Sequence, residues 1–219
     1  MSRSLSSMRL SLLMAGAAGR GALGPASGTG VGDDRRVPWP ITASRTVYAN
    51  RWIRVDHEHV IRPDGEPGEY GVVTALADAV FVVAVTDGGQ LVLVEVDRHT
   101  VGRSLEVPAG GADGDDPLAA ARRELREETG YAAREWRHLG RIDALNGVGR
   151  APEHIFLARG AHPVADAHGQ REEGIAAVQL RPLAEVLELV RTGGIRDGGS
   201  IAALLLALIH LERIDTAPL

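Results

Sequence analysis

The chain has 219 residues, of which 44% are apolar and 24% charged, and it contains no cysteine. This size and composition predict a globular protein with a sizeable core, and they exclude disulfides, thiolate catalysis and Cys-ligated metal sites. The formal net charge is -5, and all 24 basic residues are arginine. We therefore expect a small-molecule partner, not nucleic acid or a membrane, and Schiff-base or phosphate-loop lysine chemistry is excluded.

The first 36 residues are predicted to be disordered. They are rich in Ser, Gly, Ala and Arg and contain no acidic residue before Asp33. Such a segment buries too little apolar surface to offset the entropy lost on ordering. Residues 10–18 vaguely resemble a short signal or an Arg/Ser-rich transit peptide, which is the alternative interpretation.

Residues 37–75 are predicted to form a small antiparallel β subdomain. Polar and apolar residues alternate over residues 47–55 and 57–61, residues 63–65 read Pro-Asp-Gly, and a third strand begins near Tyr70. Alternation indicates strands, and Pro-Asp-Gly is a turn sequence. His57 and His59 fall on one strand face, and we interpret them as surface residues, because the eight histidines show no metal-binding spacing.

Residues 76–214 are predicted to form the main domain. Strands are expected at residues 80–85, 91–96, 136–144, 155–159 and 175–180, and helices at 183–191 and 200–213. The Asp-Gly-Gly sequence at residues 87–89 predicts a hairpin between the first two of these strands. Strands interleaved with a few helices indicate a mixed sheet with covered faces.

The strongest helix signal covers residues 117–129, between Asp116, a suitable N-cap, and Gly130, a suitable C-terminal stop. Helical spacing places Glu124, Glu127 and Glu128 within an arc of roughly 100°. These like charges require neutralisation, by arginines such as Arg123 or by a divalent cation. The alternative is an ordinary solvated helix face.

The sequence Arg-Glu-Leu-Arg-Glu-Glu-Thr-Gly-Tyr at residues 123–131 resembles the signature of the Nudix hydrolases. Five fixed letters arise by chance on the order of once in 10⁶ windows. Further segments, at residues 51–53, 63–65, 70–73, 106–110, 196–197 and 200–202, resemble the ADP-ribose pyrophosphatase branch of that family. The implied fold is α/β, a Nudix-type α/β/α sandwich with a mixed sheet, preceded by the small antiparallel β subdomain.

The sequence departs from the family pattern at three points. The first acid of the signature is Asp115 instead of Glu, and four residues instead of five separate it from Gly110. Asp97 lies beside Arg98, where the branch usually has an aromatic residue. The first two departures bear on the geometry of the loop more than on catalysis.

The resemblance also implies roles for individual residues. The expected metal ligands are Glu124, Glu128, Glu127 and the carbonyl of Ala109. The expected substrate-binding residues are Arg98, Glu106, Trp52 and Tyr70. Structural roles are expected for Arg123, Gly110 and Gly130. Glu128 is expected to lie in a cleft that faces solvent. A surface charge remains the alternative for Arg98, and core packing the favoured alternative for Trp52 and Tyr70.

A general base must come from elsewhere in the fold. By resemblance Glu173 is the first choice, as base or metal ligand, Glu153 is the reserve, and Glu127 could orient the water. Solvated loop acids are the alternative for Glu173 and Glu153.

The implied activity is Mg²⁺-dependent hydrolysis, with Mn²⁺ as a substitute, of a nucleoside diphosphate linked to another moiety. ADP-ribose is the leading substrate, giving AMP and ribose 5-phosphate. A nucleotide sugar or a dinucleotide such as NADH is the second enzymatic interpretation, and a non-catalytic nucleotide-binding regulator is the rival from another class. A cytoplasmic homodimer is expected.

Overall fold

The computed structural model describes residues 39–164, 170 and 174–212. Its strands are β1 (Ile41–Ala49), β2 (Ile53–Ile61), β3 (Pro67–Ala75), β4 (Ala79–Thr86), β5 (Gln90–Arg98), β6 (Gly102–Glu106), β7 (Ala109–Gly111), β8 (Tyr131–Ala132), β9 (Glu135–Asp143), β10 (Gly149–Arg150), β11 (Pro152–Pro163) and β12 (Ile175–Pro182). Its helices are α1 (Pro117–Thr129), α2 (Leu183–Thr192) and α3 (Gly198–His210). The segment 1–36, predicted to be disordered, lies outside the described residues.

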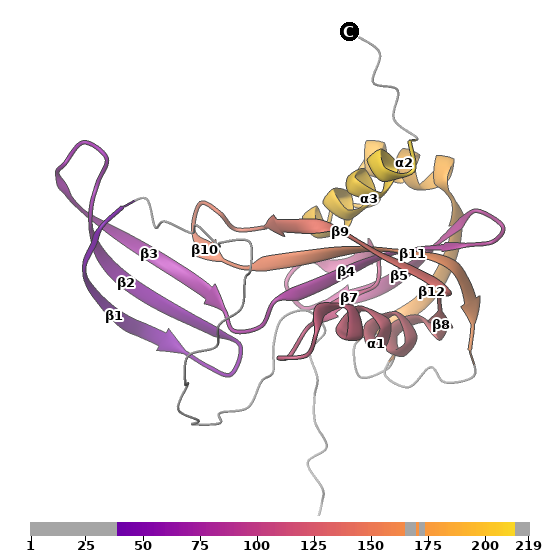
Figure 1. Ribbon diagram of the computed structural model, residues 1–219, viewed down its shortest axis with the longest axis horizontal. Coiled ribbons are helices and arrows are strands. Elements are labelled where there is room, and N and C mark those ends of the chain that lie inside the picture. The colour runs from indigo at the N-terminus through magenta and orange to yellow at the C-terminus, as the bar shows by residue number, and fades with distance from the viewer. Residues whose placement is uncertain (1–38, 165–169, 171–173, 213–219) are drawn as a thin grey trace, which may run out of the picture.

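The N-terminal part of the chain forms a sheet with the order β1-β2-β3-β10, which projects to one side of the molecule (Figure 1). The sequence placed one strand over residues 47–55, and this boundary is wrong, because β1 ends at Ala49 and β2 starts at Ile53. The side chain of Asn50 accepts hydrogen bonds from the backbone N–H groups of Trp52 and Ile53, both at 2.8 Å. This local turn separates β1 from β2, although the alternation of polar and apolar residues continues across it.

The second sheet carries the main domain. Its path is β12-β5-β4-β11-β8, with β6 paired to β5, β7 to β4 and β9 to β11. Strands β4 and β11 run parallel, whereas β4 and β5 form the antiparallel hairpin that Asp-Gly-Gly predicts. Helix α1 covers one face of the sheet, and α2 and α3 cover the other (Figure 1). The predicted α/β sandwich with a mixed sheet, preceded by a small sheet on its N-terminal side, is therefore confirmed.

Alternate side chains of β4 separate two parts of the core. Ala79, Phe81 and Val83 pack with residues of α2 and α3. Val80 and Val82 pack on the opposite side, against Ala120, Ala121 and Leu125 of α1. Strand β4 is buried on both faces, which explains why its sequence is a continuous apolar run instead of an alternating one.

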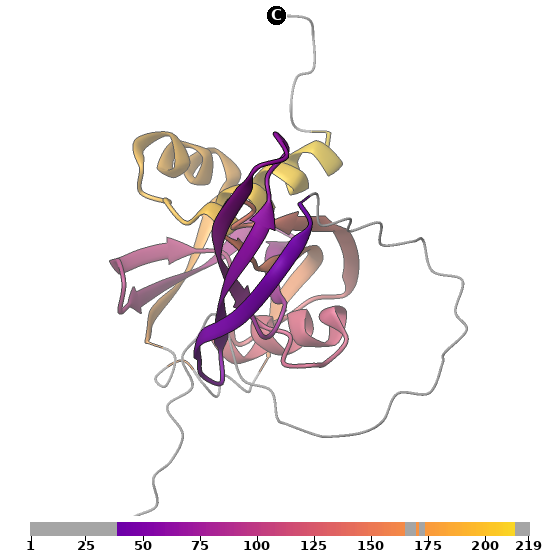
Figure 2. The same cartoon turned by 90° about the vertical axis from the view of Figure 1, so that its left-hand side faces the viewer.

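The two sheets are connected through the chain that leads into β11. The short strand β10 pairs parallel with β3, at Gly149 with Val73 and Arg150 with Thr74. In the orientation of Figure 2 the N-terminal sheet lies in front of the main domain. Because β10 joins this sheet from far along the chain, the domain boundary between residues 75 and 76 stays a prediction. None of the described helices is long and apolar enough to cross a membrane.

Candidate active site

Helix α1 has the ends that its sequence predicts. The Asp116 side chain accepts a hydrogen bond from the N–H of Ala119 at 3.1 Å. Proline occupies the start of the helix, and Gly130 ends it with a left-handed φ of 70°. The helix packs through Ala120, Ala121 and Leu125 against the sheet, and this packing fixes the direction in which its glutamates project.

Glu124 and Glu128 are buried at the edge of the sheet, and they lie against β7. The backbone N–H of Ala109 donates a hydrogen bond to Oε2 of Glu128 at 2.9 Å. A Cβ atom added at Gly110 would lie 2.2 Å from Cδ of Glu124 and within 2.5 Å of both its carboxylate oxygens. Only glycine lets the carboxylate approach so closely. The predicted structural importance of Gly110 therefore has a steric basis.

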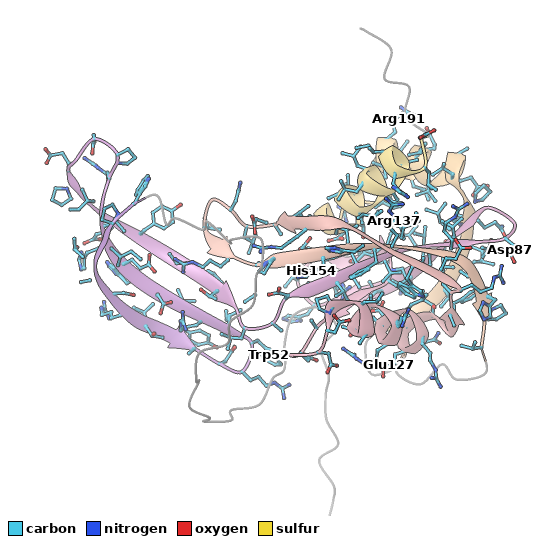
Figure 3. All side chains as sticks on the ribbon, viewed as in Figure 1. Trp52, Asp87, Glu127, Arg137, His154 and Arg191 are labelled. Atoms are coloured by element: carbon cyan, nitrogen blue, oxygen red, sulfur yellow. The ribbon has the colours of Figure 1, made fainter. Side chains whose placement is uncertain are left out.

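The solvent-facing position expected for Glu128 is wrong, and Glu124 is buried as well. Glu124 is 5% exposed and Glu128 1%, so the packing of α1 on the sheet removes both from water. Glu127 is the partly exposed member, with a side chain that is 34% exposed. Figure 3 shows Glu127 on the side of α1 that faces away from the sheet.

Arg123 links α1 to β7. Its guanidinium donates to Glu124 at 2.7 Å, to Glu127 at 3.3 Å and to the carbonyl of Gly111 at 2.8 Å. Partial burial lowers the pKa of Arg123, but the charges of Glu124 and Glu127 outweigh it, so the net shift is upward. Arg123 stays charged and pairs with two of the carboxylates, and its structural role stays a prediction.

A second buried ion pair lies next to this helix. Arg98 donates to both oxygens of Glu106, with 2.5 Å between Nη2 and Oε2, and the two side chains are 12% and 4% exposed. Burial lowers the pKa of Arg98, but the pair with Glu106 and the charges of Glu128 and Asp197 raise it on balance. Arg98 is therefore no isolated surface charge, since it is paired with Glu106 and lies within the electrostatic influence of Glu128 in α1 and of Asp197 before α3.

Two residues at the start of α3 complete this region, and no role was predicted for either of them. Oδ2 of Asp197 accepts a hydrogen bond from the N–H of Ser200 at 2.7 Å. The Ser200 hydroxyl accepts one from the N–H of Val107 at 3.0 Å, across 93 residues of sequence. Ser200 thereby fixes the segment that leads to Ala109. The available sequence signal was the N-cap pattern of Asp197 followed three residues later by Ser200.

Glu153, the reserve candidate for the base, lies on the face of the sheet that α3 covers. A Cβ atom added at Gly199 of α3 would be 2.9 Å from its Oε2 and 2.3 Å from the ring of Phe81. Burial, followed by the negative charge of Asp197, raises the pKa of Glu153 to about 7. Glu153 is thus connected to the charged region through Asp197, whereas α1 covers the opposite face. Glu173, the first choice, lies outside the described residues.

The two predicted stacking residues lie apart in the N-terminal sheet. Trp52 occupies the turn before β2 (Figure 3). The guanidinium of Arg51 lies 4.2 Å from the centroid of its ring. Tyr70 in β3 meets the edge of Trp39 at 5.8 Å between centroids, and its hydroxyl donates to the carbonyl of Gly147. Both aromatic residues are partly exposed, and their stacking on a substrate stays a prediction.

The groups around Gly110 fit a hard divalent cation. Two buried carboxylates and a third at the rim supply oxygen ligands of the kind that Mg²⁺ prefers. The side-chain-free backbone at Gly110 gives these carboxylates room.

Asp115 is exposed, and the shortened loop is closed by a hydrogen bond from its N–H to the carbonyl of Ala112 at 2.8 Å. Asp113 and Gly114 adopt positive φ angles of 51° and 87° in that loop.

Two family models match the chain. One, described as a NUDIX domain, matches residues 75–203, which is more than half of the sequence. The other, described as a nucleoside diphosphate sugar hydrolase N-terminal domain, matches residues 39–73.

Similar proteins agree with these matches. A CMP-5'-(N-acetyl-N-hydroxy-3-aminopropyl)phosphonate hydrolase of Streptomyces rubellomurinus is 36% identical over 176 residues, covering 78% of this chain and 82% of the relative. An ADP-ribose pyrophosphatase of Mycobacterium tuberculosis is 33% identical over 170 residues, covering 74% of this chain and 80% of the relative. A crystal structure of an ADP compounds hydrolase has a TM-score of 0.70 at 23% identity, covering 80% of this chain and 97% of its own, which supports the fold alone.

Proposed function

The chain belongs to the Nudix hydrolase family and is similar to its ADP-ribose pyrophosphatase branch, and on this premise we propose that it hydrolyses ADP-ribose. Water adds to one phosphorus atom of the diphosphate, the bridging P–O bond breaks, and AMP and ribose 5-phosphate are released. The observation that supports this most directly is the buried carboxylate pair of Glu124 and Glu128 against the backbone of Ala109 and Gly110. A binding module would gain nothing from two buried like charges.

Glu124, Glu128, Glu127 and the carbonyl of Ala109 are the groups that we propose to hold Mg²⁺, with Mn²⁺ as a substitute. When bound, such an ion neutralises phosphate charge, orients the substrate and lowers the pKa of the attacking water. Arg123 keeps Glu124 and Glu127 oriented through its ion pairs.

Substrate binding is proposed for Arg98 at the end of β5 and for two aromatic residues of the N-terminal subdomain. Arg98 offers a guanidinium held by Glu106 to the outlying phosphate, and charge-assisted hydrogen bonds of this type are strong. Trp52 and Tyr70 are proposed to stack on the adenine ring. Each ring already has a neighbour, Arg51 at Trp52 and Trp39 at Tyr70, so an adenine would have to stack on the face that the neighbour leaves open.

Two carboxylates remain candidates for the general base. Glu173 stays the first choice by resemblance alone. Glu153 has the pKa near neutrality that suits a base at physiological pH, but it lies on the α3 side of the sheet. Replacing each by Gln separates them, since loss of the base lowers kcat while substrate binding is retained.

The proposed assembly is a cytoplasmic homodimer formed through the N-terminal strands. All nine residues of β1 are exposed, and they include Ile41, Val47 and Tyr48. An exposed edge strand with apolar side chains is a ready surface for pairing. A light-scattering mass near that of one chain would contradict the dimer.

A nucleotide sugar is the second candidate substrate, because residues 39–73 match a domain of nucleoside diphosphate sugar hydrolases. A dinucleotide such as NADH is the third. The decisive experiment is a panel of ADP-ribose, several nucleotide sugars and NADH with purified full-length protein, with and without Mg²⁺. We expect the highest kcat/KM for ADP-ribose and no turnover without a divalent ion.

The rival function is a non-catalytic nucleotide-binding regulator, and the shortened loop with Asp115 is the reason to consider it. The same panel separates the two. Binding of ADP-ribose by calorimetry without turnover of any substrate under Mg²⁺ or Mn²⁺ would favour the regulator. Turnover that disappears in Glu128→Gln would favour the enzyme.

A further inference from the structure

A group of metal-ligand side chains lies in the N-terminal sheet, away from α1. His57 and His59 are two residues apart on β2, so both imidazoles project from the same face. Antiparallel pairing places Glu69 of β3 directly opposite His59, and Gly71 opposite His57. The register of β2 and β3 therefore brings two imidazoles and one carboxylate together. This grouping is not evident from the sequence, because Glu69 is ten residues away from His59 along the chain.

The three side chains are close enough to one another to bind a single metal ion. One ligand atom from each lies within 4.8 Å of the other two. Nε2 of His57 is 3.6 Å from Oε2 of Glu69, and Nδ1 of His59 is 3.9 Å from Oε1 of Glu69. Ligand atoms around a tetrahedral zinc ion are separated by roughly 3.3 Å, given bonds of about 2.0–2.1 Å. Small rotations about the side-chain bonds are enough to close the difference.

The environment of the His57 ring supports a role as metal ligand more directly than its distance from Glu69 does. Its Nε2 atom is shielded from solvent and has no hydrogen-bond partner within the described part of the chain. A shielded imidazole nitrogen without a partner loses the hydrogen bond that water would have given it. Gly71, opposite His57, has open space where its Cβ would be, so no side chain at this position fills the space beside the ring.

The charges around the group allow a single dication. Arg45 of β1 lies opposite His57, but it is exposed and its long side chain can extend into water. Glu69 is 68% exposed and supplies negative charge from β3. The alternative is a solvated cluster in which protonated histidines pair with Glu69, and this alternative requires no metal.

We propose that His57, His59 and Glu69 form a binding site for a transition-metal dication of the Zn²⁺ class, with an open fourth position for water. Two imidazoles and a carboxylate select Zn²⁺, Cu²⁺ or Ni²⁺, whereas Mg²⁺ prefers an oxygen-only set. The site cross-links β2 to β3 and does not depend on the proposed hydrolase activity.

The test uses full-length protein stripped with EDTA and held in excess Mg²⁺, so that oxygen-only sites are saturated. Zn²⁺ is titrated by calorimetry, and Co²⁺ by its visible absorption, which reports nitrogen ligands and coordination geometry. We expect one strong equivalent per chain and a Tm that rises with Zn²⁺. Both His59→Ala and Glu69→Gln should weaken binding by at least the roughly 10–100-fold that loss of even an outer-shell partner costs.

The matched control is His138→Ala, which alters the other close histidine pair, with His154 at 3.4 Å between ring nitrogens. This variant should bind Zn²⁺ as the unmodified chain does. Absence of a strong Zn²⁺ equivalent, or equal binding by His59→Ala, Glu69→Gln and His138→Ala, would overturn the proposal. Circular dichroism checks that each variant is folded. If His59→Ala does not fold, the more conservative Glu69→Gln still tests the proposal.

Discussion

The backbone N–H of Ala109 donates a buried hydrogen bond to Oε2 of Glu128 at 2.9 Å, across 19 residues of sequence. The bond ties β7 to the last turn of α1. Glu128 therefore has two functions in the structure, since one oxygen fixes the backbone while the carboxylate contributes charge to the proposed metal site.

The first prediction concerns that charge. Glu128→Gln keeps an oxygen that can accept from Ala109 but removes the negative charge. We expect kcat on ADP-ribose to fall at least about 100-fold, the usual size of effect when one transition-state-stabilising group is lost. The urea midpoint should change little. Glu135→Gln, on the exposed start of β9, is the control and should keep full activity. An unchanged rate in Glu128→Gln would mean that a metal is held elsewhere.

The second prediction concerns the close approach of Glu124 to Gly110. Gly110→Ala would place a Cβ within 2.5 Å of the carboxylate, so Glu124 must move. We expect a loss of about 1–3 kcal/mol in the free energy of unfolding, as in other overpacked sites, together with a large fall in kcat. Urea denaturation and steady-state kinetics measure the two effects. Gly71→Ala has open space at its Cβ and should alter kcat little. Equal behaviour of both variants would show that the contact is unimportant.

The sequence predicted local structure well and long-range contacts poorly. Asp116 and Gly130 define α1 because capping depends on neighbouring residues, and both ends were predicted correctly. The hydrogen bond between Ser200 and Val107 spans 93 residues, and no local pattern encodes it. The burial of Glu124 and Glu128 also escaped prediction, since helical spacing gives a shared face but not the strand that covers it. Likewise, the pairing register of β2 with β3 places Glu69 beside His59.

The third prediction concerns the buried pair of Arg98 and Glu106. Arg98→Met leaves Glu106 buried without its counter-charge, and breaking such a pair costs about 3–5 kcal/mol. The double variant Arg98→Met/Glu106→Gln should recover part of this loss, because no buried charge remains. Urea denaturation of the single variants Arg98→Met and Glu106→Gln and of the double variant measures the coupling. Losses that simply add would show that the pair is not coupled.

A conservative change at the same position tests the proposed phosphate contact. Arg98→Lys keeps the charge but not the paired N–H groups of the guanidinium. We expect KM for ADP-ribose to rise with a smaller change in kcat. An unaltered KM in a folded variant would leave Arg98 with a purely structural role.

The last prediction concerns Glu153, whose pKa is raised from 4.5 to about 7 by burial and by the charge of Asp197. Between these two values the native chain holds a proton that the unfolded chain has already released. The free energy of unfolding must therefore fall as the pH rises through this window, and the penalty is complete above the folded-state pKa. Allowing for the partial exposure of Glu153, we expect about 1–3 kcal/mol.

Glu153→Gln removes this titration. The variant should match the unmodified chain in urea denaturation at acidic pH, near the unperturbed pKa of the carboxyl, and exceed its stability at mildly alkaline pH. Asp197→Asn is the complementary change, because it removes the second cause of the shift, although it also alters the cap of α3. If the difference between Glu153→Gln and the unmodified chain stays constant with pH, Glu153 ionises normally. Its candidacy as a base with a pKa near neutrality would then be lost as well.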